Sequence, residues 1–225
     1  SNGKLNAEMD ALGTCELTAL SDAGGRELLS GGHIGKLMLY DAKQPKIQFM
    51  LKDMKVNGRN PVVVSTATVP PYEGANPEQN PLMDLRIARS FELDGNTILV
   101  RFRFSNPTSH MMNFGFRVNN YPQPGLRFGK KNLTISLGTE KVTQNSGLDN
   151  LFLRKNVKIG FLPHGKSRLW DGGPVVISAQ DKVLKDSMAF FPGPGFEGVY
   201  CWNANSKTPM MTVEFLSGGV SLAPG

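Results

Sequence analysis

The alternation of apolar and polar residues in residues 97–104 constrains the fold more than any other feature of the sequence. Apolar side chains recur at every second position, at Ile98, Val100, Phe102 and Phe104, and cations occupy much of the alternate set. Successive side chains of a strand point to opposite faces, so this pattern predicts a strand with one apolar face. Residues 83–93 alternate in a similar way, and the Asp94-Gly95 pair between the two segments tolerates the positive φ angles of a tight turn. We therefore expect a β-hairpin here.

The rest of the chain predicts an all-β protein. Its 25 glycines and 15 prolines interrupt short β-branched or aromatic runs roughly every eight to twelve residues. Further strands are expected at residues 35–39, 47–51, 61–67, 112–118, 133–137, 157–162, 175–179, 198–203 and 211–216. Short helices are expected only in residues 5–12 and 181–188, and the proline-rich residues 69–81 read as a long surface loop. No repeat or linker divides the chain, so we expect a single domain over residues 1–225, with residues 1–29 as an N-terminal segment.

Charge, apolar runs and cysteines exclude several classes of function. The net charge is +6, but no helix-turn-helix or RRM-like signature accompanies it, so nucleic acid is not an expected partner. The apolar runs are too short to span a bilayer, so we expect no membrane partner either. Cys15 and Cys201 lack a CxxC or a histidine at metal-ligand spacing, and we expect no metal and no cofactor. The two cysteines are read either as a disulfide or as two buried thiols.

Three segments, taken in order, resemble a known family. They are SGGHIGKLML at residues 30–39, LRIARSFELDGNTILVRFRFSN at residues 85–106 and TVEFLSGGVSLAPG at residues 212–225. Their order resembles that of the galactose mutarotase-like, or aldose 1-epimerase-like, proteins. The resemblance implies an antiparallel β supersandwich and a sugar or polysaccharide as partner. This fold occurs in sugar epimerases and in domains of glycoside hydrolases and polysaccharide lyases, so fold alone does not decide the role.

The resemblance also identifies a departure from the family pattern. Epimerases of this type carry a general-acid histidine in a phrase like GFxxHxYF, and the matching residues 115–122 read GFRVNNYP. If Tyr121 matches the family's tyrosine, Asn119 stands at the histidine position. Mutarotation needs a proton donor with a pKa near the working pH, and an amide cannot serve. By its position in the closing strand Glu214 matches the base, and His164 is the candidate for a displaced acid.

Sugar binding makes different demands from catalysis. Aromatic faces stack on the apolar side of a pyranose, while arginine and amide groups bind its hydroxyls. The candidate ligand-binding residues are Arg117, Asn119, Tyr121, Arg168, Trp170 and Trp202. No GxSxG, GxGxxG or Walker pattern offers another chemistry.

We therefore expect a carbohydrate-binding or carbohydrate-associated supersandwich that is not catalytic alone. The alternatives are an active aldose 1-epimerase with Glu214 and His164, and a structural protein-interaction sandwich. The family usually continues beyond a Leu-x-Pro-Gly turn, so we expect other domains of a larger chain, or a degenerate member. We predict a secreted or periplasmic location, although SNGKLNAEMD lacks the apolar core of a signal peptide, so any signal has been removed or never existed.

Overall fold

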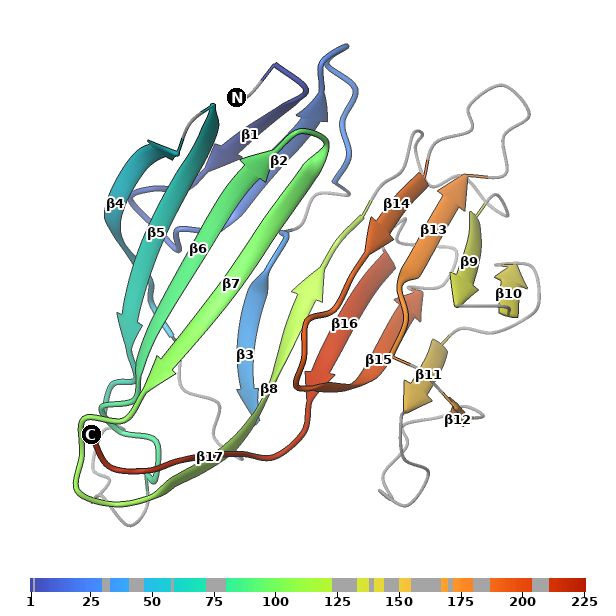
Figure 1. Ribbon diagram of the computed structural model, residues 1–225. Coiled ribbons are helices and arrows are strands. Elements are labelled where there is room, and N and C mark those ends of the chain that lie inside the picture. The colour runs from blue at the N-terminus through green and yellow to red at the C-terminus, as the bar shows by residue number, and fades with distance from the viewer. Residues whose placement is uncertain are drawn as a thin grey trace. The chain divides into compact units, whose positions relative to one another are not determined.

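The chain is all-β in the residues that the computed structural model describes, which are 1, 3–29, 33–40, 47–57, 59–71, 80–122, 133–137, 140–143, 150–154, 167–169, 172–179, 187–203 and 211–225. The predicted fold class is confirmed. The strands in these residues are β1 (Leu5–Met9), β2 (Leu17–Asp22), β3 (Lys36–Tyr40), β4 (Met50–Asn57), β5 (Asn60–Thr68), β6 (Arg86–Asp94), β7 (Thr97–Ser105), β8 (Met112–Asn120), β9 (Leu133–Leu137), β10 (Glu140–Thr143), β11 (Asn150–Arg154), β12 (Ser167–Leu169), β13 (Val175–Ala179), β14 (Ser187–Phe190), β15 (Phe196–Asn203), β16 (Met211–Ser217) and β17 (Val220–Leu222) (Figure 1).

The chain divides into two compact units. Unit 1 comprises Ser1–Gly25, Leu37–Phe116 and Gly219–Gly225, and unit 2 comprises Arg26–Lys36 and Arg117–Gly218. Strand β8 contributes residues to both: its first part pairs with β17, and its last four residues pair with β16. The single-domain organisation stays a prediction.

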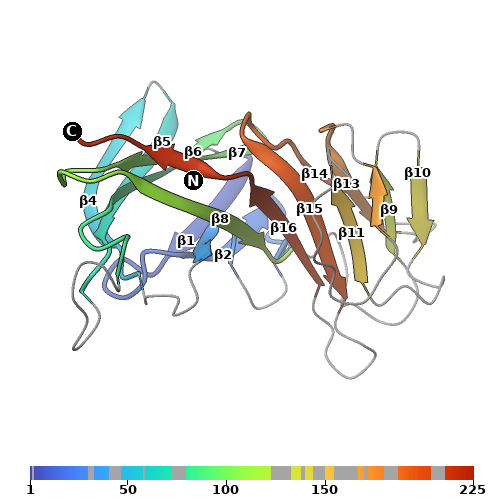
Figure 2. The ribbon, with the colours of Figure 1, turned by 90° about the horizontal axis from the view of Figure 1, so that it is seen from below.

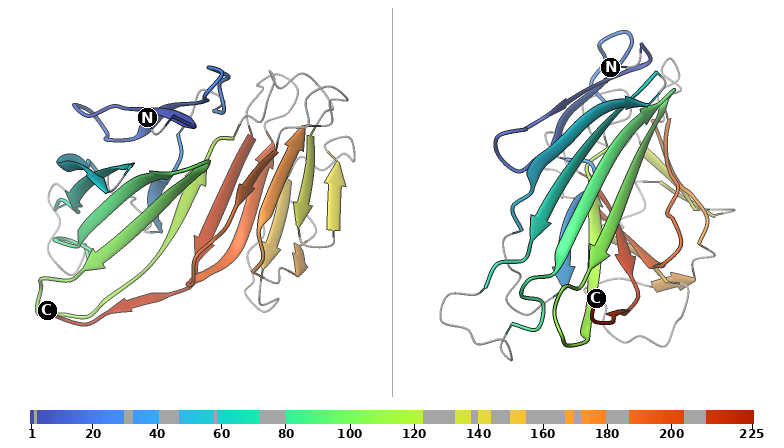
Figure 3. Two further views of the ribbon diagram at one scale, coloured as in Figure 1. Left: turned by 45° about the horizontal axis from the view of Figure 1, so that its top comes forward. Right: turned by 60° about the vertical axis from the view of Figure 1, so that its left-hand side comes forward.

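Unit 1 contains the antiparallel sheet β4-β5-β6-β7, in which β6 and β7 form the predicted hairpin (Figures 1 and 3). Asp94 pairs with Thr97, so the two turn residues are Gly95 and Asn96, one position later than the sequence suggested. Gly95 has φ +57, whereas Asn96 is not among the residues with positive φ. A glycine with positive φ at the first turn position is the pattern of a type II′ turn, whose twist matches that of the two strands.

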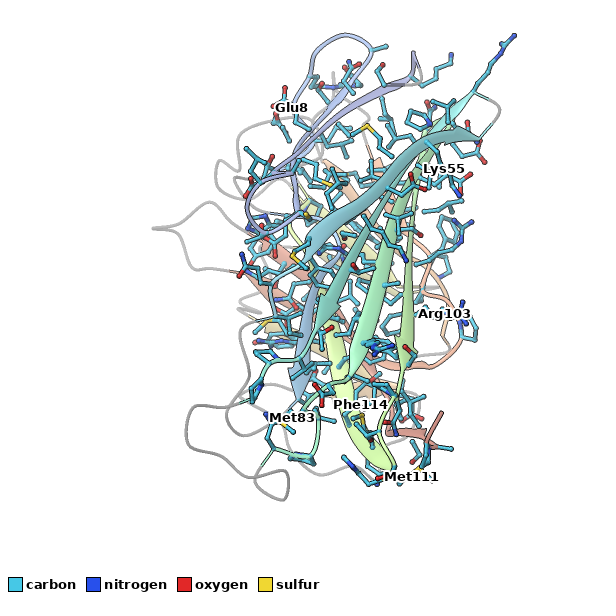
Figure 4. The ribbon with its side chains drawn as sticks, turned by 90° about the vertical axis from the view of Figure 1, so that its left-hand side faces the viewer. Glu8, Lys55, Met83, Arg103, Met111 and Phe114 are labelled. Atoms are coloured by element: carbon cyan, nitrogen blue, oxygen red, sulfur yellow. The ribbon has the colours of Figure 1, made fainter. Side chains whose placement is uncertain are left out.

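The alternation of β7 is also confirmed, but its apolar face is only half-buried. Its cations Arg101 and Arg103 are exposed, while the apolar residues between them are partly covered. In Figure 4, Arg103 points away from the strand. Phe104 packs against Phe114 and Phe116 of β8, with ring centroids 5.2 Å and 4.9 Å apart. The partial burial follows because β7 lies at the edge of its sheet and is covered on one face only.

The core of unit 1 includes an arginine. Arg89 of β6 is 1% exposed. Its Nη2 donates to the carbonyl oxygens of Thr14, at 3.2 Å, and of Cys15, and its Nε donates to Ser65 Oγ at 3.4 Å. The guanidinium also lies 4.0 Å from the ring centroid of Phe49, a favourable cation–π arrangement. Arg89 therefore holds the β1–β2 connection against the sheet.

The expected helix at residues 5–12 is wrong. Leu5–Met9 is strand β1, which pairs antiparallel with β2. Backbone N–H groups of Gly13 and Thr14 donate to the Asp10 carboxylate at 2.9 Å and 3.1 Å. Cys15 has φ +50, an angle that a continuing helix does not adopt. These features turn the chain back after β1, so that pairing with β2 replaces helical hydrogen bonds.

Unit 2 contains two sheets. One has the order β12-β11-β15-β16 and continues to residues 117–120 of β8, and the other has the order β10-β9-β13-β14 (Figures 1 and 2). All pairings are antiparallel except β11 with β12, which is parallel. Val199, Val213 and Phe215 are buried core residues of the first sheet, and the Phe196 ring packs against that of Phe215 at 5.7 Å.

Several other expectations have mixed outcomes. In the second expected helix, residues 187–188 begin strand β14, which pairs with β13, so that part is wrong, and residues 181–186 lie outside the described residues. The expected strand at 157–162 and residues 72–79 of the expected loop also lie outside them. Strands β2, β10, β11, β12, β14 and β17 were not expected. Cys15 and Cys201 are both buried and free, which selects the buried-thiol alternative. Among the described residues, no helix has the length and apolar character needed to cross a membrane.

Candidate functional site

The candidate site is centred on Glu214 of strand β16, within unit 2. The antiparallel ladder places Asn119 of β8 directly opposite Glu214 on one side and Tyr200 of β15 opposite it on the other. Glu214 and Asn119 are 6% and 5% exposed, and Tyr200 is half-buried. Residues that pair directly in a sheet share a face. Three neighbouring strands therefore bring a carboxylate, an amide and a phenol to one row.

Two hydrogen bonds orient the Glu214 carboxylate. Arg117 of β8 donates from Nη1 to Glu214 Oε2 at 2.9 Å, and Thr212 donates from Oγ1 to Glu214 Oε1 at 2.9 Å. Thr212 precedes Glu214 by two positions on the same strand, so both side chains point to one face. The side chain of Arg117 is 29% exposed and that of Glu214 is 8% exposed. The carboxylate is thus held from two directions, and the guanidinium reaches toward solvent.

Arg117 keeps unused hydrogen-bonding capacity. Its Nε is buried and has no hydrogen-bond partner in the described part of the chain. A guanidinium has five N–H donors, and buried donors are ordinarily satisfied. An acceptor that entered beside Arg117 would meet a donor of fixed direction.

The negative charge of Glu214 affects two neighbouring groups. Burial, followed by the charge of Glu214, raises the pKa of the Tyr200 phenol. The same two causes raise the pKa of the Cys201 thiol to about 12. Both groups are therefore protonated at neutral pH, and Tyr200 can act as a neutral hydroxyl donor at the site.

The N-terminal segment of unit 2 is attached to the end of β8. Asn120 Oδ1 accepts a hydrogen bond from the Gly35 N–H at 3.1 Å, and Asn120 Nδ2 donates to the Val213 carbonyl at 3.0 Å. The Tyr121 N–H donates to the His33 carbonyl at 2.9 Å. The rings of His33 and Tyr121 meet edge to face, 6.1 Å apart. These contacts fix Tyr121 and place an imidazole beside it.

The structure brings together only part of the predicted site. Arg117, Asn119 and Glu214 converge, and Tyr121 follows at the end of β8. Backbone pairing places Trp202 opposite Thr212, two positions along the ladder from the Tyr200–Glu214 pair. Arg168 pairs with Leu153, which pairs with Val199, so Arg168 is in register with the residue next to Tyr200 and not with Tyr200 itself. His164 and Trp170 lie outside the described residues.

Two neighbours were not selected from the sequence. Thr212 could have been found from its spacing, because a residue two positions from Glu214 on a strand shares its face. His33 carried no such signal in the sequence. Its place beside Tyr121 depends on contacts between segments far apart in the sequence. Among the described residues, no group of three or more His, Cys, Asp or Glu side chains could hold a metal ion.

Comparison with known proteins identifies the fold. No model of a protein family matches the chain, and no curated protein matches it. Solved structures do match. A galactose mutarotase related enzyme from Lactobacillus acidophilus is 12% identical, with a TM-score of 0.64 over 100% of this chain and 92% of that chain. A galactose mutarotase-like protein from Lactobacillus casei is 17% identical, with a TM-score of 0.58 over 100% and 94%.

A third structure gives the same result. A galactose mutarotase-like protein from Clostridium acetobutylicum is 11% identical, with a TM-score of 0.59 over 99% of this chain and 89% of that chain. At these identities the likeness concerns the fold, and it extends over the whole chain. Together with the all-β architecture, it shows that this chain has the galactose mutarotase-like fold.

Proposed function

We propose that the chain binds a carbohydrate at the row formed by Asn119, Glu214 and Tyr200 together with the adjacent Arg117, and that it does not exchange sugar anomers by itself. The observation that carries the proposal is the buried Glu214 carboxylate, which Arg117 and Thr212 hold at 2.9 Å each. A buried, oriented carboxylate beside an amide and a phenol, on a galactose mutarotase-like fold, favours a polar ligand with many hydroxyl groups.

The chemistry of the row suits a sugar. Each sugar hydroxyl both donates and accepts, so a site for it needs donors and acceptors in fixed positions. Arg117 supplies donors, Glu214 supplies acceptors, and the Asn119 amide supplies both. Tyr200 contributes a protonated hydroxyl because its pKa is raised. Strand positions hold these groups more rigidly than loop positions do.

The absence of catalysis is inferred from Asn119. This residue lies directly across the ladder from Glu214, and in the family pattern its position belongs to the general-acid histidine. Anomer exchange requires one group that removes a proton from the anomeric hydroxyl and another that donates one to the ring oxygen. Glu214 can take the first role, but the Asn119 amide has no proton to give near neutral pH. A bound sugar would be held without being converted.

A second candidate function is a sugar isomerase with Glu214 as base. The observation that favours it is the edge-to-face contact between His33 and Tyr121, which brings an imidazole to the end of β8. Imidazole is the side chain whose ordinary pKa best suits proton transfer near neutral pH. In this alternative His33, or the predicted His164, replaces the missing histidine.

Sugar binding is tested by calorimetric titration with a panel of hexoses and oligosaccharides at millimolar concentration. For any sugar that binds, we expect Arg117→Met to raise the Kd at least tenfold, a loss of about 1.4 kcal/mol. Arg103→Met is the matched control, because Arg103 is an exposed strand arginine of unit 1, and it should leave the Kd unchanged. If no sugar binds, or if both variants bind like the wild type, the proposal is wrong.

Catalysis is tested by polarimetry with freshly dissolved α-anomers of several hexoses. The proposal predicts rates equal to those of the buffer. A rate above the buffer that disappears in Glu214→Gln would establish the isomerase instead. The variants His33→Gln and His164→Gln then identify which imidazole acts as the acid.

A further inference from the structure

Strand β4 exposes more large apolar side chains than any other described element. Met50, Leu51, Met54 and Val56 are 68%, 40%, 66% and 68% exposed. These four are half of the eight large hydrophobic side chains that are exposed among the described residues. A run of apolar side chains on one short strand is a feature of surfaces that contact another molecule.

The same strand has an open edge. It is the outermost strand of the sheet β4-β5-β6-β7 and, among the described strands, it pairs only with β5 (Figure 1). Lys55, labelled in Figure 4, lies on it. The N–H and C=O groups along an open edge form a template for one more strand. We call residues 53–56 the β4 edge.

Charge complementarity identifies the occupant. In a two-fold antiparallel pairing centred on one residue, the residue before it lies opposite the residue after it in the other copy. Centred on Met54, this places Asp53 opposite Lys55 of the second copy, and Lys55 opposite Asp53 of the second copy. Neither residue has an ion-pair partner in the described part of the chain. The pairing would give each charge an opposite charge.

Other registers oppose like charges. A pairing centred on Asp53 places two carboxylates together, and one centred on Lys55 places two ammonium groups together. Registers that oppose residues one or three positions apart, such as Lys52 with Asp53 or Lys52 with Lys55, are excluded, because such residues point to opposite faces of the strand whereas directly opposed residues share a face. Like charges directly opposite each other destabilise a strand pair, so the register centred on Met54 is favoured.

We propose that the β4 edge pairs with the β4 edge of a second copy of this chain, about a two-fold axis at Met54. Met54 and Val56 share a face, because they pair with Val63 and Pro61 of β5. In the dimer the two Met54 side chains meet on this face, with Val56 of each copy diagonally beside them. The two Asp53–Lys55 pairs lie on the other face.

A charge swap tests the register. Sedimentation velocity from about 1 µM to about 500 µM should show a dimer of the wild-type chain. Asp53→Lys and Lys55→Asp should each weaken dimerisation at least tenfold, because each places like charges opposite one another. The double variant Asp53→Lys/Lys55→Asp should restore it. A wild-type monomer at every concentration would overturn the proposal and leave the edge for a strand of a different protein. A double variant no better than the single variants would also overturn it.

Disulfide trapping provides an independent measurement that does not depend on charge. Directly opposed residues of an antiparallel pair have Cα atoms about 4.5 to 5.5 Å apart, within disulfide range. Met54→Cys should therefore form a covalent dimer under mild oxidation, as seen on a non-reducing gel. Met111→Cys is the control, because Met111 is 51% exposed and lies outside β4. Equal yields from the two variants would contradict the proposal.

Discussion

Two arginines on strands of this chain have opposite relations to their surroundings. Arg89, in unit 1, is 1% exposed and donates to two backbone carbonyls and a serine hydroxyl. Arg117, in unit 2, pairs with one carboxylate, and its side chain is 29% exposed. Burial lowers the pKa of Arg89 to about 10, which records the cost of desolvating its charge.

The difference separates a structural arginine from one that is available to a ligand. Backbone carbonyls, the Ser65 hydroxyl, aromatic rings and the negative charge of Glu16 surround Arg89, which holds the β1–β2 connection on the sheet. Arg117 holds a buried carboxylate in place and keeps a buried Nε without an acceptor in the described part of the chain. Both residues are arginines on strands, so burial and partners distinguish their roles.

The largest effect is expected from Arg89→Leu. The substitution leaves the carbonyl groups of Thr14 and Cys15 buried without their donor. Each such group costs about 1 to 3 kcal/mol, so we expect a loss of about 3 to 5 kcal/mol in the free energy of unfolding. Urea denaturation followed by circular dichroism measures it.

The control for this prediction is Arg103→Leu, an exposed arginine on the neighbouring strand β7, which should change stability by less than about 0.5 kcal/mol. Equal losses in the two variants would show that Arg89 is not the link between β1–β2 and the sheet. A sugar site in unit 2 should keep its affinity in folded Arg89→Leu protein.

The second effect concerns the two buried thiols, that of Cys15 beside Arg89 and that of Cys201 near Glu214. Burial and then Glu214 raise the pKa of Cys201 to about 12 from an ordinary 9.0. A raised acid pKa gives stability that is complete below pH 9 and is lost as the pH rises toward 12, because the unfolded chain releases the proton first. Between about pH 8 and pH 10.5 this thiol should account for about 2 kcal/mol of lost stability.

Cys201→Ala removes this loss, so its free energy of unfolding should fall less steeply with pH than that of the wild type. Cys15→Ala is the paired comparison. Burial raises the pKa of Cys15, but the positive charge of Arg89 opposes the shift, so this variant should change the slope less. If the free energy of unfolding of Cys201→Ala, measured by urea denaturation, fell as steeply with pH as that of the wild type, the raised pKa of Cys201 would not be the cause of the loss.

Sequence predicted the elements whose pattern is local. The hairpin of β6 and β7 needed only alternation and a turn glycine, and both are within a short segment. A short helix was expected in residues 5–12, but Leu5, Ala7 and Met9 alternate with Asn6 and Glu8, and the segment pairs with β2 as a strand. The alternation is too short to identify the strand without its pairing partner.

The candidate site shows the same limit. Glu214 was identified through the resemblance and Arg117 as a group suited to sugar hydroxyls, but they are separated by 97 positions, and no local pattern predicts that they meet. The register in which β8 pairs with β16 places Asn119 opposite Glu214. Once Glu214 is identified, Thr212 can be found by its spacing on the same strand. The place of His33 beside Tyr121 depends on a contact between segments far apart in the sequence.

The smallest expected effect distinguishes the two members of the Arg117–Glu214 pair. Their side chains are 29% and 8% exposed, so water can solvate an arginine left alone more easily than a carboxylate left alone. We expect Arg117→Met to cost about 2 kcal/mol of unfolding free energy and Glu214→Gln about 1 kcal/mol. The double variant should lie within about 1 kcal/mol of the wild type, because it leaves no buried charge. For Arg89, no second substitution removes the backbone carbonyl groups of Thr14 and Cys15 to which its guanidinium donates. If urea denaturation shows that the costs of the two single variants simply add, the pair does not act as a unit, and the contrast with Arg89 loses its basis.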